Sequence, residues 1–201
     1  MLRNILLVHI ELSFRTIARA EILILNISDY MSPDSEYTET HENKIYATLD
    51  KLGIAYQSLH HPAIMTMEEG AEIAQKLGCT SCKSLFLTNK QQEYFMLLLP
   101  ANKKLKTKEL AGQIGSSHLS FASEKAMENL LCTFPGAVSI LGLIYDKENK
   151  VQLLIDKEIL ESTYIGCHPC VNTCSLKIRL EDILKILLPK ISHQNFNIVE
   201  L

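Results

Sequence analysis

Two long apolar runs in the middle of the chain constrain its fold more than any other feature. The first extends from Lys83 to Thr88 (KSLFLT) and the second from Glu93 to Leu99 (EYFMLLL), and a short polar segment separates them. Apolar runs of this length, joined in this way, predict two strands of a β-hairpin that is buried on both faces. We therefore expect a sheet at the centre of the fold.

The rest of the sequence predicts helices interspersed with further strands. Predicted helices cover residues 44–53, 66–78, 107–114, 123–131 and 180–188, and predicted strands cover residues 54–59, 137–145, 150–156 and 173–179. Thr66 and Glu69 form a capping box at the start of the second helix, and Pro189 is expected to end the last one. The strands over 137–145 and 150–156 should pair as a second hairpin. This mixture predicts the α+β or mixed α/β class, built around one sheet.

Length and composition fit one globular domain preceded by additional sequence. The chain has 201 residues, of which 47% are hydrophobic. We expect residues 1–41 to form an N-terminal extension and polar linker, and residues 42–201 to form the domain. The polar stretch that suggests the linker covers residues 32–43. Residues 1–30 have two open interpretations, an added helix or sequence that precedes a true start at Met31. No run of about 18 uncharged apolar residues occurs, so we expect no membrane span.

The charge of the chain argues against a surface devoted to nucleic acid. The formal net charge is −3, whereas nucleic-acid-binding domains usually carry a basic footprint. One local exception is a basic segment that contains Lys103, Lys104, Lys106 and Lys108. Such a segment is typical of a solvated helix start, and it is also suited to contact a phosphate backbone. These four lysines are therefore the candidate RNA contact.

Six cysteines leave three interpretations open. They are Cys79, Cys82, Cys132, Cys167, Cys170 and Cys174. Two C-x-x-C pairs have the spacing of zinc ligands, although the pairs lie farther apart than in a compact zinc ribbon. The Cys167–Cys170 segment (CHPC) also has the outline of a redox dithiol. No clear secretory signal precedes the cysteines, so we expect mainly free thiols without metal, in a cytoplasmic protein.

Three segments carry the candidate catalytic and binding residues. Lys83 begins an apolar strand, either as a solvated strand end or as a cation beside a cleft. Residues 135–139 (PGAVS) combine a turn with small residues, which suits an ordinary turn or a close approach of backbone to ligand. Residues 166–173 (GCHPCVNT) form a shaped loop in which His168 could exchange protons, donate a hydrogen bond or bind metal, although most loop histidines do none of these.

Five segments occur in a distinctive order and spacing. They are His61-Pro62-Ala63, Lys83–Leu87 (KSLFL), Ser120–Ser123 (SFAS), Pro135–Ser139 (PGAVS), and His168-Pro169 with Asn172-Thr173. Together they resemble the YbaK-like aminoacyl-tRNA deacylases over about residues 42–201. PGAVS and the HPxxNT pattern are most similar to the ProX or PrdX-like branch, which clears alanine from tRNA(Pro). Ser84 departs from the asparagine expected in that branch, and Leu141-Gly142 departs slightly from a pattern in which proline follows the serine.

The resemblance implies a fold, a reaction and a set of site residues. The implied fold is a single mixed α/β domain with a strongly curved, barrel-like sheet flanked by helices. The implied reaction is hydrolysis of the ester that joins a wrong amino acid to tRNA, without cofactor or metal. Lys83 and His168 would be catalytic. The aminoacyl pocket would be formed by Pro135, Gly136, Ala137, Val138, Ser139, Gly166 and Asn172.

The implied partners follow from the same resemblance. Mischarged tRNA would be the substrate, with Ala-tRNA(Pro) favoured and with acceptor-stem contacts at Lys103, Lys104, Lys106 and Lys108. Prolyl-tRNA synthetase is a further expected partner, and we expect a monomer or weak dimer. Because of Ser84, removal of cysteine or serine remains an alternative. A non-catalytic module that binds tRNA or a synthetase is another.

Overall fold

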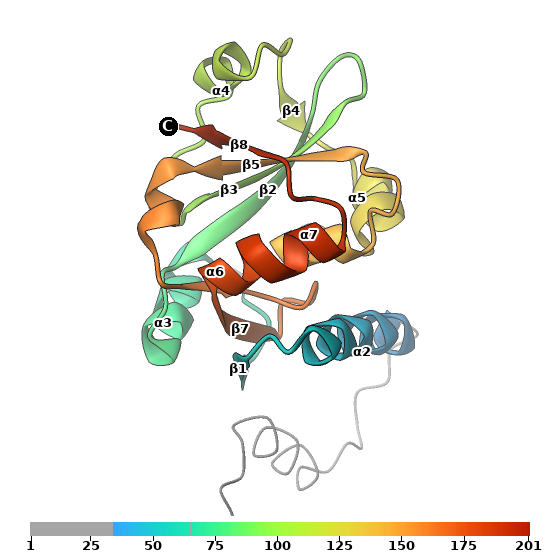
Figure 1. The fold of residues 1–201 in the computed structure, drawn as a ribbon, viewed down its shortest axis with the longest axis vertical. Helices are drawn as coiled ribbons and strands as arrows, with labels where there is room; N and C mark the ends of the chain where they lie inside the picture. The colour runs from blue at the N-terminus through green and yellow to red at the C-terminus, as the bar shows by residue number, and fades with distance from the viewer. Residues whose placement is uncertain (1–33, 65) are drawn as a thin grey trace, which may run out of the picture. The chain divides into compact units, whose positions relative to one another are not determined.

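The computed structural model describes residues 34–64 and 66–201, which belong to one compact unit, residues 31–201 (Figure 1). Expectations about residues 1–30 and Met31 lie outside the described residues. Helical segments are α2 (Asp34–Leu52), α3 (Met67–Leu77), α4 (Thr107–Gln113), α5 (Glu124–Leu131), α6 (Leu180–Asp182), the π-helical η3 (Ile183–Leu187) and α7 (Leu188–Lys190), with 3-10 turns η1 (Ile140–Ile144) and η2 (Lys157–Glu161). No helix among these is both long enough and apolar enough to cross a membrane.

The predicted central hairpin is confirmed and forms the middle of a five-stranded sheet. The strand order is β4 (Ser120–Phe121), β2 (Cys82–Thr88), β3 (Tyr94–Pro100), β5 (Val151–Asp156) and β8 (Phe196–Val199). β2 pairs antiparallel with β3 and β4, whereas β3–β5 and β5–β8 are parallel pairs. The sheet is therefore mixed, which confirms the α+β or mixed class.

Both faces of this sheet are covered, as the apolar hairpin predicts. Alternate residues of β3 point to opposite faces because the side-chain period of a strand is two. Met96 and Leu98 belong to the larger core cluster, which also includes α2, α5 and the C-terminal helical segment. Phe95 and Leu97 belong to a smaller cluster under α4. The hairpin is thus packed between two layers.

A second sheet contains three strands and lies beside the first. Its order is β1 (Tyr56–His60), β7 (Cys174–Arg179) and β6 (Tyr164–Cys167), all antiparallel. A single parallel bridge between Thr80 and Ile165 connects β6 to the segment before β2. In the described residues neither sheet closes on itself, and the strands at their outer edges do not pair with each other. The expected barrel-like sheet is therefore wrong, since closure requires those edges to pair.

Three expectations about local structure are also wrong. Residues 137–145 do not form a strand, because they lead into the buried 3-10 turn η1, and β5 pairs with β3 instead of forming a second hairpin. Residues 34–43 belong to α2 rather than to a linker. The last helical segment passes through Pro189 and ends at Lys190. A π-helical turn, η3, immediately precedes that segment and widens the helix where the proline ring would otherwise meet the preceding turn.

Candidate active site

A cavity of about 680 Å³ brings most of the candidate residues together. Its walls come from α3, the first half of β2, the segment 121–124, the loop over 135–138, and the region 166–175 where β6 leads into β7. The candidates that line it are Lys83, Pro135, Gly136, Val138, Gly166, His168 and Asn172. Segments distant in the sequence therefore share one concave surface, which is the usual form of a small-ligand site.

Lys83 supplies the positive charge of this cavity. It is the one lysine or arginine among the described residues that line the cavity, and no carboxylate of the described chain forms an ion pair with it. Its Nζ donates a hydrogen bond to the Ala101 carbonyl at 3.0 Å. Partial burial lowers the pKa of Lys83, because desolvation disfavours the charged form. A cation without an acidic partner is available for an anionic or polarised group of a ligand.

The start of β2 is fixed against β6, and this fixes Lys83. The Cys82 thiol donates to the Gly166 carbonyl at 2.9 Å, and the Gly166 N–H donates to the Thr80 carbonyl at 2.9 Å. A side chain at Gly166 would place Cβ 3.2 Å from Cys79 Sγ, which is closer than ordinary contact. Glycine at 166 thus permits β6 to pack closely against the segment that leads into β2 and Lys83.

The loop over 135–139 divides its residues between the cavity and the core. Pro135, Gly136 and Val138 line the cavity, and Gly136 has a φ of +89°, which favours glycine. Ala137 and Ser139 do not line it. The Ala137 carbonyl accepts a hydrogen bond from Thr133 Oγ1 at 2.7 Å, and Ser139 Oγ accepts one from the Leu141 N–H. These two residues therefore hold the loop in place.

His168 presents a neutral imidazole at the cavity. Burial lowers the pKa of His168 to about 4, and the neighbouring His61 adds to this effect, whereas hydrogen bonding to the Ala137 backbone opposes it. The ring nitrogen Nδ1 is buried and has no hydrogen-bond partner. A buried polar atom without a partner is costly, so this nitrogen is suited to bind a ligand or a water molecule.

The low pKa of His168 predicts a loss of stability in acid. Between pH 6.5 and pH 4 the unfolded chain binds a proton at this residue that the folded chain does not bind, so stability falls as pH falls. From pH 7 to pH 5 we expect His168 to reduce the free energy of unfolding by about 2 kcal/mol. The free energy of unfolding of His168→Gln, measured with urea at pH 7 and pH 5, should lack this component. Equal pH dependence in wild type and variant would contradict the prediction.

A second histidine belongs to the cavity although the sequence did not mark it as a site residue. Since a carbonyl can only accept, His61 Nδ1 donates to the Pro62 carbonyl at 2.9 Å, and in the neutral ring Nε2 accepts from the Ser175 hydroxyl at 2.9 Å. Backbone hydrogen bonds also join His61 to Thr173 and Ile64 to Asn172. Asn172 therefore lines the cavity from a loop that is tied to the His61 segment.

The cavity residues discussed above lie within residues 61–186, which match the family model of the aminoacyl-tRNA editing domain. The chain belongs to the aminoacyl-tRNA editing domain family. This confirms the predicted family.

The editing domain is similar to known proteins over most of its length. It is 31% identical over 158 residues to the prolyl-tRNA editing protein ProX of Acetoanaerobium sticklandii, covering 78% of this chain and 95% of that protein. It is 30% identical over 141 residues to the prolyl-tRNA synthetase associated domain-containing protein 1 of Danio rerio, covering 69% of this chain and 77% of that protein. A solved structure of a candidate trans-editing enzyme for prolyl-tRNA synthetase has a TM-score of 0.61 at 15% identity, covering 86% of this chain and 98% of that chain. This likeness supports the fold. The family and the ProX relative bear out the predicted enzyme class, aminoacyl-tRNA deacylase.

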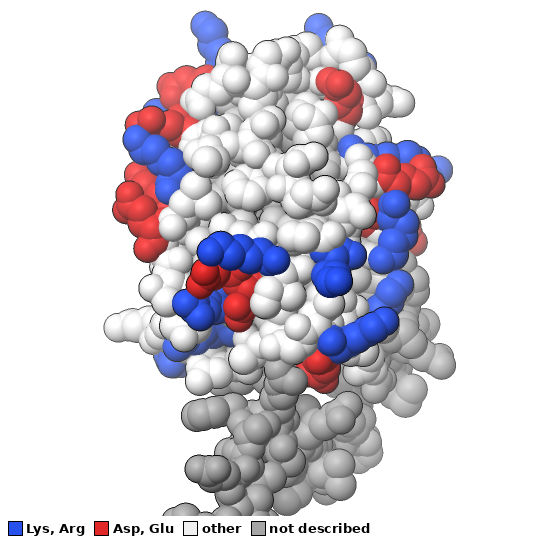
Figure 2. Space-filling model, in the orientation of Figure 1, with Lys and Arg blue, Asp and Glu red and all other residues white. Residues whose placement is uncertain are grey.

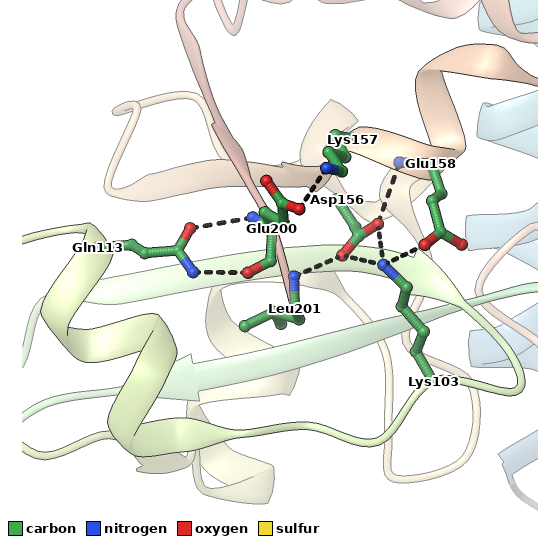
Figure 3. Close-up of polar contacts among 7 residues, drawn as sticks. All are labelled: Lys103, Gln113, Asp156, Lys157, Glu158, Glu200 and Leu201. Carbon is green, nitrogen blue, oxygen red and sulfur yellow. Dashed lines mark hydrogen bonds and ion pairs between the residues drawn. The ribbon is translucent and has the colours of Figure 1, made fainter.

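The four candidate tRNA-binding lysines of the editing domain lie outside the cavity and differ in their surroundings. Lys103 Nζ lies 2.9 Å from Asp156 Oδ1 and 2.8 Å from Glu158 Oε1, and Figure 3 shows it between these two carboxylates. Lys104, Lys106 and Lys108 are exposed, and Lys106 pairs with Glu109. In Figure 2, Lys and Arg side chains lie among Asp and Glu on the face shown, without one continuous basic field. Lys103 is thus held within the fold, and the other three remain accessible.

The cysteines of the editing domain do not form the zinc site that their spacing suggested. In the part of the chain that the structure describes, the potential metal ligands within 4.8 Å of one another are Glu42, His60 and Cys174, with neither C-x-x-C pair among them. All six cysteines are free thiols. Burial raises the pKa of Cys82 and Cys170 to about 12. Thiolates, which redox exchange requires, are therefore scarce near neutral pH.

Proposed function

We propose that this editing domain acts in trans on mischarged tRNA(Pro), with Ala-tRNA(Pro) as its preferred substrate. The observation that carries the proposal is the unpaired Lys83 cation inside a cavity walled by the Gly136 loop and His168. Further support comes from the relative named as a prolyl-tRNA editing protein. An aminoacyl ester is already activated, so a positioned water and charge stabilisation can account for its hydrolysis.

The chemistry assigns distinct roles to two side chains. Water attacks the ester carbonyl carbon, the carbonyl oxygen gains negative charge, and Lys83 stabilises that charge. His168 Nδ1 is buried and has no hydrogen-bond partner, and we assign it the acceptor tautomer, in which it accepts a hydrogen bond from the attacking water. With a pKa of about 4, His168 is a weak base and orients the water rather than holding its proton. The C–O bond to the ribose then breaks, and the ribose oxygen takes up the proton as the amino acid leaves.

Selectivity for alanine would come from the size of the subsite at the Gly136 loop. A synthetase gains only about 1–3 kcal/mol for each methylene that distinguishes two substrates, so small amino acids enter its site by error. A second site that is too small for proline removes them. Pro135, Gly136 and Val138 are the lining residues that would set this limit. Ser84 also lines the cavity, so cysteine or serine as the removed amino acid is the second candidate.

A panel of aminoacylated tRNAs tests the substrate. We expect Ala-tRNA(Pro) to be deacylated fastest by the wild-type protein, and Ser84→Asn to retain that preference while it lowers any activity on Cys-tRNA(Pro) or Ser-tRNA. Faster hydrolysis of cysteine or serine esters would transfer the proposal to that amino acid. If all esters survive although tRNA binds, the protein is a non-catalytic module. Binding of prolyl-tRNA synthetase, which the name of the Danio rerio relative suggests, can be measured with the same preparations.

We further propose that Lys104, Lys106 and Lys108 contact the tRNA backbone, whereas Lys103 supports the fold. Each phosphate contact contributes about 0.7–0.9 to the slope of log affinity against log salt. Replacing the three lysines with alanine should therefore weaken tRNA binding and reduce that slope by about 2. A control with three other exposed lysines replaced (Lys147, Lys185 and Lys190) changes net charge equally. Equal losses in both variants would mean that net charge, not this segment, governs binding.

A further inference from the structure

Phe121 is an aromatic side chain that the fold holds out toward solvent at the cavity. It ends the two-residue strand β4 and is 63% exposed. Its backbone is nevertheless fixed, because it pairs with Leu87 of β2 and the following Ala122 N–H donates to the Phe86 carbonyl at 3.0 Å. An exposed ring on a fixed backbone is preorganised to contact a ligand.

Exposed apolar side chains gather around this cavity. The exposed large hydrophobic residues in the described chain are Met67, Phe121, Phe134, Tyr164 and Ile198. Met67 and Phe121 line the cavity, and Phe134 directly precedes the lining residue Pro135. Apolar surface that collects at one site, instead of being scattered, marks a contact with a partner or ligand. The rim of the cavity is therefore suited to a flat, apolar group.

The position of Phe121 along the sheet indicates which part of the substrate it meets. Its partner Leu87 lies four residues after Lys83 on β2, a separation of roughly 13 Å at about 3.3 Å per residue. This distance is comparable to the length of one nucleoside with an amino acid on its ribose. An ester held at Lys83 thus places the base of the same nucleotide near Phe121. Unpaired bases at RNA ends are commonly bound by stacking on aromatic side chains.

We propose that Phe121 is the stacking surface for the nucleobase of the 3′-terminal nucleotide of tRNA. The inference rests on the proposed function, because it requires an aminoacyl ester at Lys83. Phe121 is a binding residue in this account and takes no part in the bond changes. Stacking would position the ribose so that the ester reaches the Lys83 end of the cavity.

Steady-state deacylation of Ala-tRNA(Pro) tests this role. Phe121→Ala should raise KM by about 5- to 150-fold, which is the range that stacking of one base supplies, with a smaller effect on kcat. Phe121→Trp, which keeps a stacking face, should restore KM to within a few fold of wild type. Ile198→Ala, a similar loss of exposed apolar surface away from the cavity, should leave both constants unchanged.

A substrate whose terminal base is absent separates stacking from a structural effect. Affinity for uncharged tRNA(Pro) with an intact end and with an abasic 3′ end should be measured for wild type and Phe121→Ala. If the inference holds, loss of the base weakens tRNA binding by wild type but has little further effect on tRNA binding by Phe121→Ala. The comparison is a double-mutant cycle between the base and the ring. Equal weakening in both proteins, or wild-type KM in Phe121→Ala, would overturn it. Because these affinities need no turnover, they remain informative even if no ester is hydrolysed, which would instead refute the proposed function.

Discussion

Lys83→Ala is expected to lower kcat for Ala-tRNA(Pro) by about 10²- to 10³-fold, the usual effect of removing one charge-stabilising group from an acyl-transfer site. The reason is that Lys83 is the one lysine or arginine among the described residues of the cavity. The measurement is single-turnover deacylation with labelled alanine. Lys83→Arg keeps the charge but changes its shape and reach, so it should recover part of the rate.

The folded state should tolerate this substitution, which allows chemistry and stability to be separated. Lys83 forms one hydrogen bond, to the Ala101 carbonyl, and its charge is partly desolvated. We therefore expect the melting temperature of Lys83→Ala to stay within a few degrees of wild type, as surface-like substitutions do. Lys147→Ala, an exposed lysine away from the cavity, is the matched control. A fully active Lys83→Ala protein would remove Lys83 from the mechanism.

Asp156→Ala is expected to cause a large loss of stability. Asp156 is fully buried and accepts hydrogen bonds from Lys103 Nζ, from the Glu158 N–H and from the Leu201 N–H (Figure 3). Removing one partner from a buried ion pair typically costs about 3–5 kcal/mol, because the remaining charge stays buried without an opposite charge beside it. Here the free energy of unfolding should fall by about 3 kcal/mol, since Glu158 still pairs with Lys103. For a domain of this size, we expect a melting temperature roughly 6–12 °C lower.

Glu158→Ala provides the control for Asp156→Ala. It removes the other carboxylate next to Lys103, but the Glu158 side chain is 51% exposed. Exposed ion pairs contribute about 0–1 kcal/mol, so the change should be small. Both variants should be compared by urea unfolding and calorimetry. Similar small changes in both would contradict the prediction that the buried carboxylate is a major source of stability.

The sequence was most informative where a local pattern has one physical meaning. The hairpin over β2 and β3 follows from two apolar runs with a short polar link, which few other structures accommodate. Helix α3 follows from Thr66 and Glu69, which form the predicted capping box, and from Gly78, which ends the helix with a φ of +64°. Lys83 and the loops around Gly136 and His168 were found because they occur in a characteristic order along the chain.

The sequence was least informative where the same pattern suits two structures. The apolar run at 140–144 fits a buried strand as well as a buried helical turn. The turn is formed, with Gly142 packed so closely that an added Cβ would lie 3.2 Å from Leu131 Cβ. Polar residues 34–43 fit a linker or a helix, and helix α2 extends into them from the buried Ile45 and Leu49.

The contribution of His61 to the site depends on contacts that no local pattern encodes. Its ring reaches Ser175, which is 114 residues away in the chain, because β1 and β7 are neighbours in the three-stranded sheet. Strand pairing over such a distance is set by the whole fold. The His61-Pro62-Ala63 segment was a signal for the family, but only the structure placed its histidine and Ser175 in the cavity.

The most direct test of the central claim compares two amino acids on one tRNA. Wild-type protein should be incubated with Ala-tRNA(Pro) and, separately, with Pro-tRNA(Pro), and the remaining ester measured over time against Lys83→Ala. The account predicts rapid loss of alanine and survival of the proline ester with wild-type protein, and alanine loss about 10²- to 10³-fold slower with the variant. Equal hydrolysis of both esters, or survival of the alanine ester with wild-type protein, would contradict it.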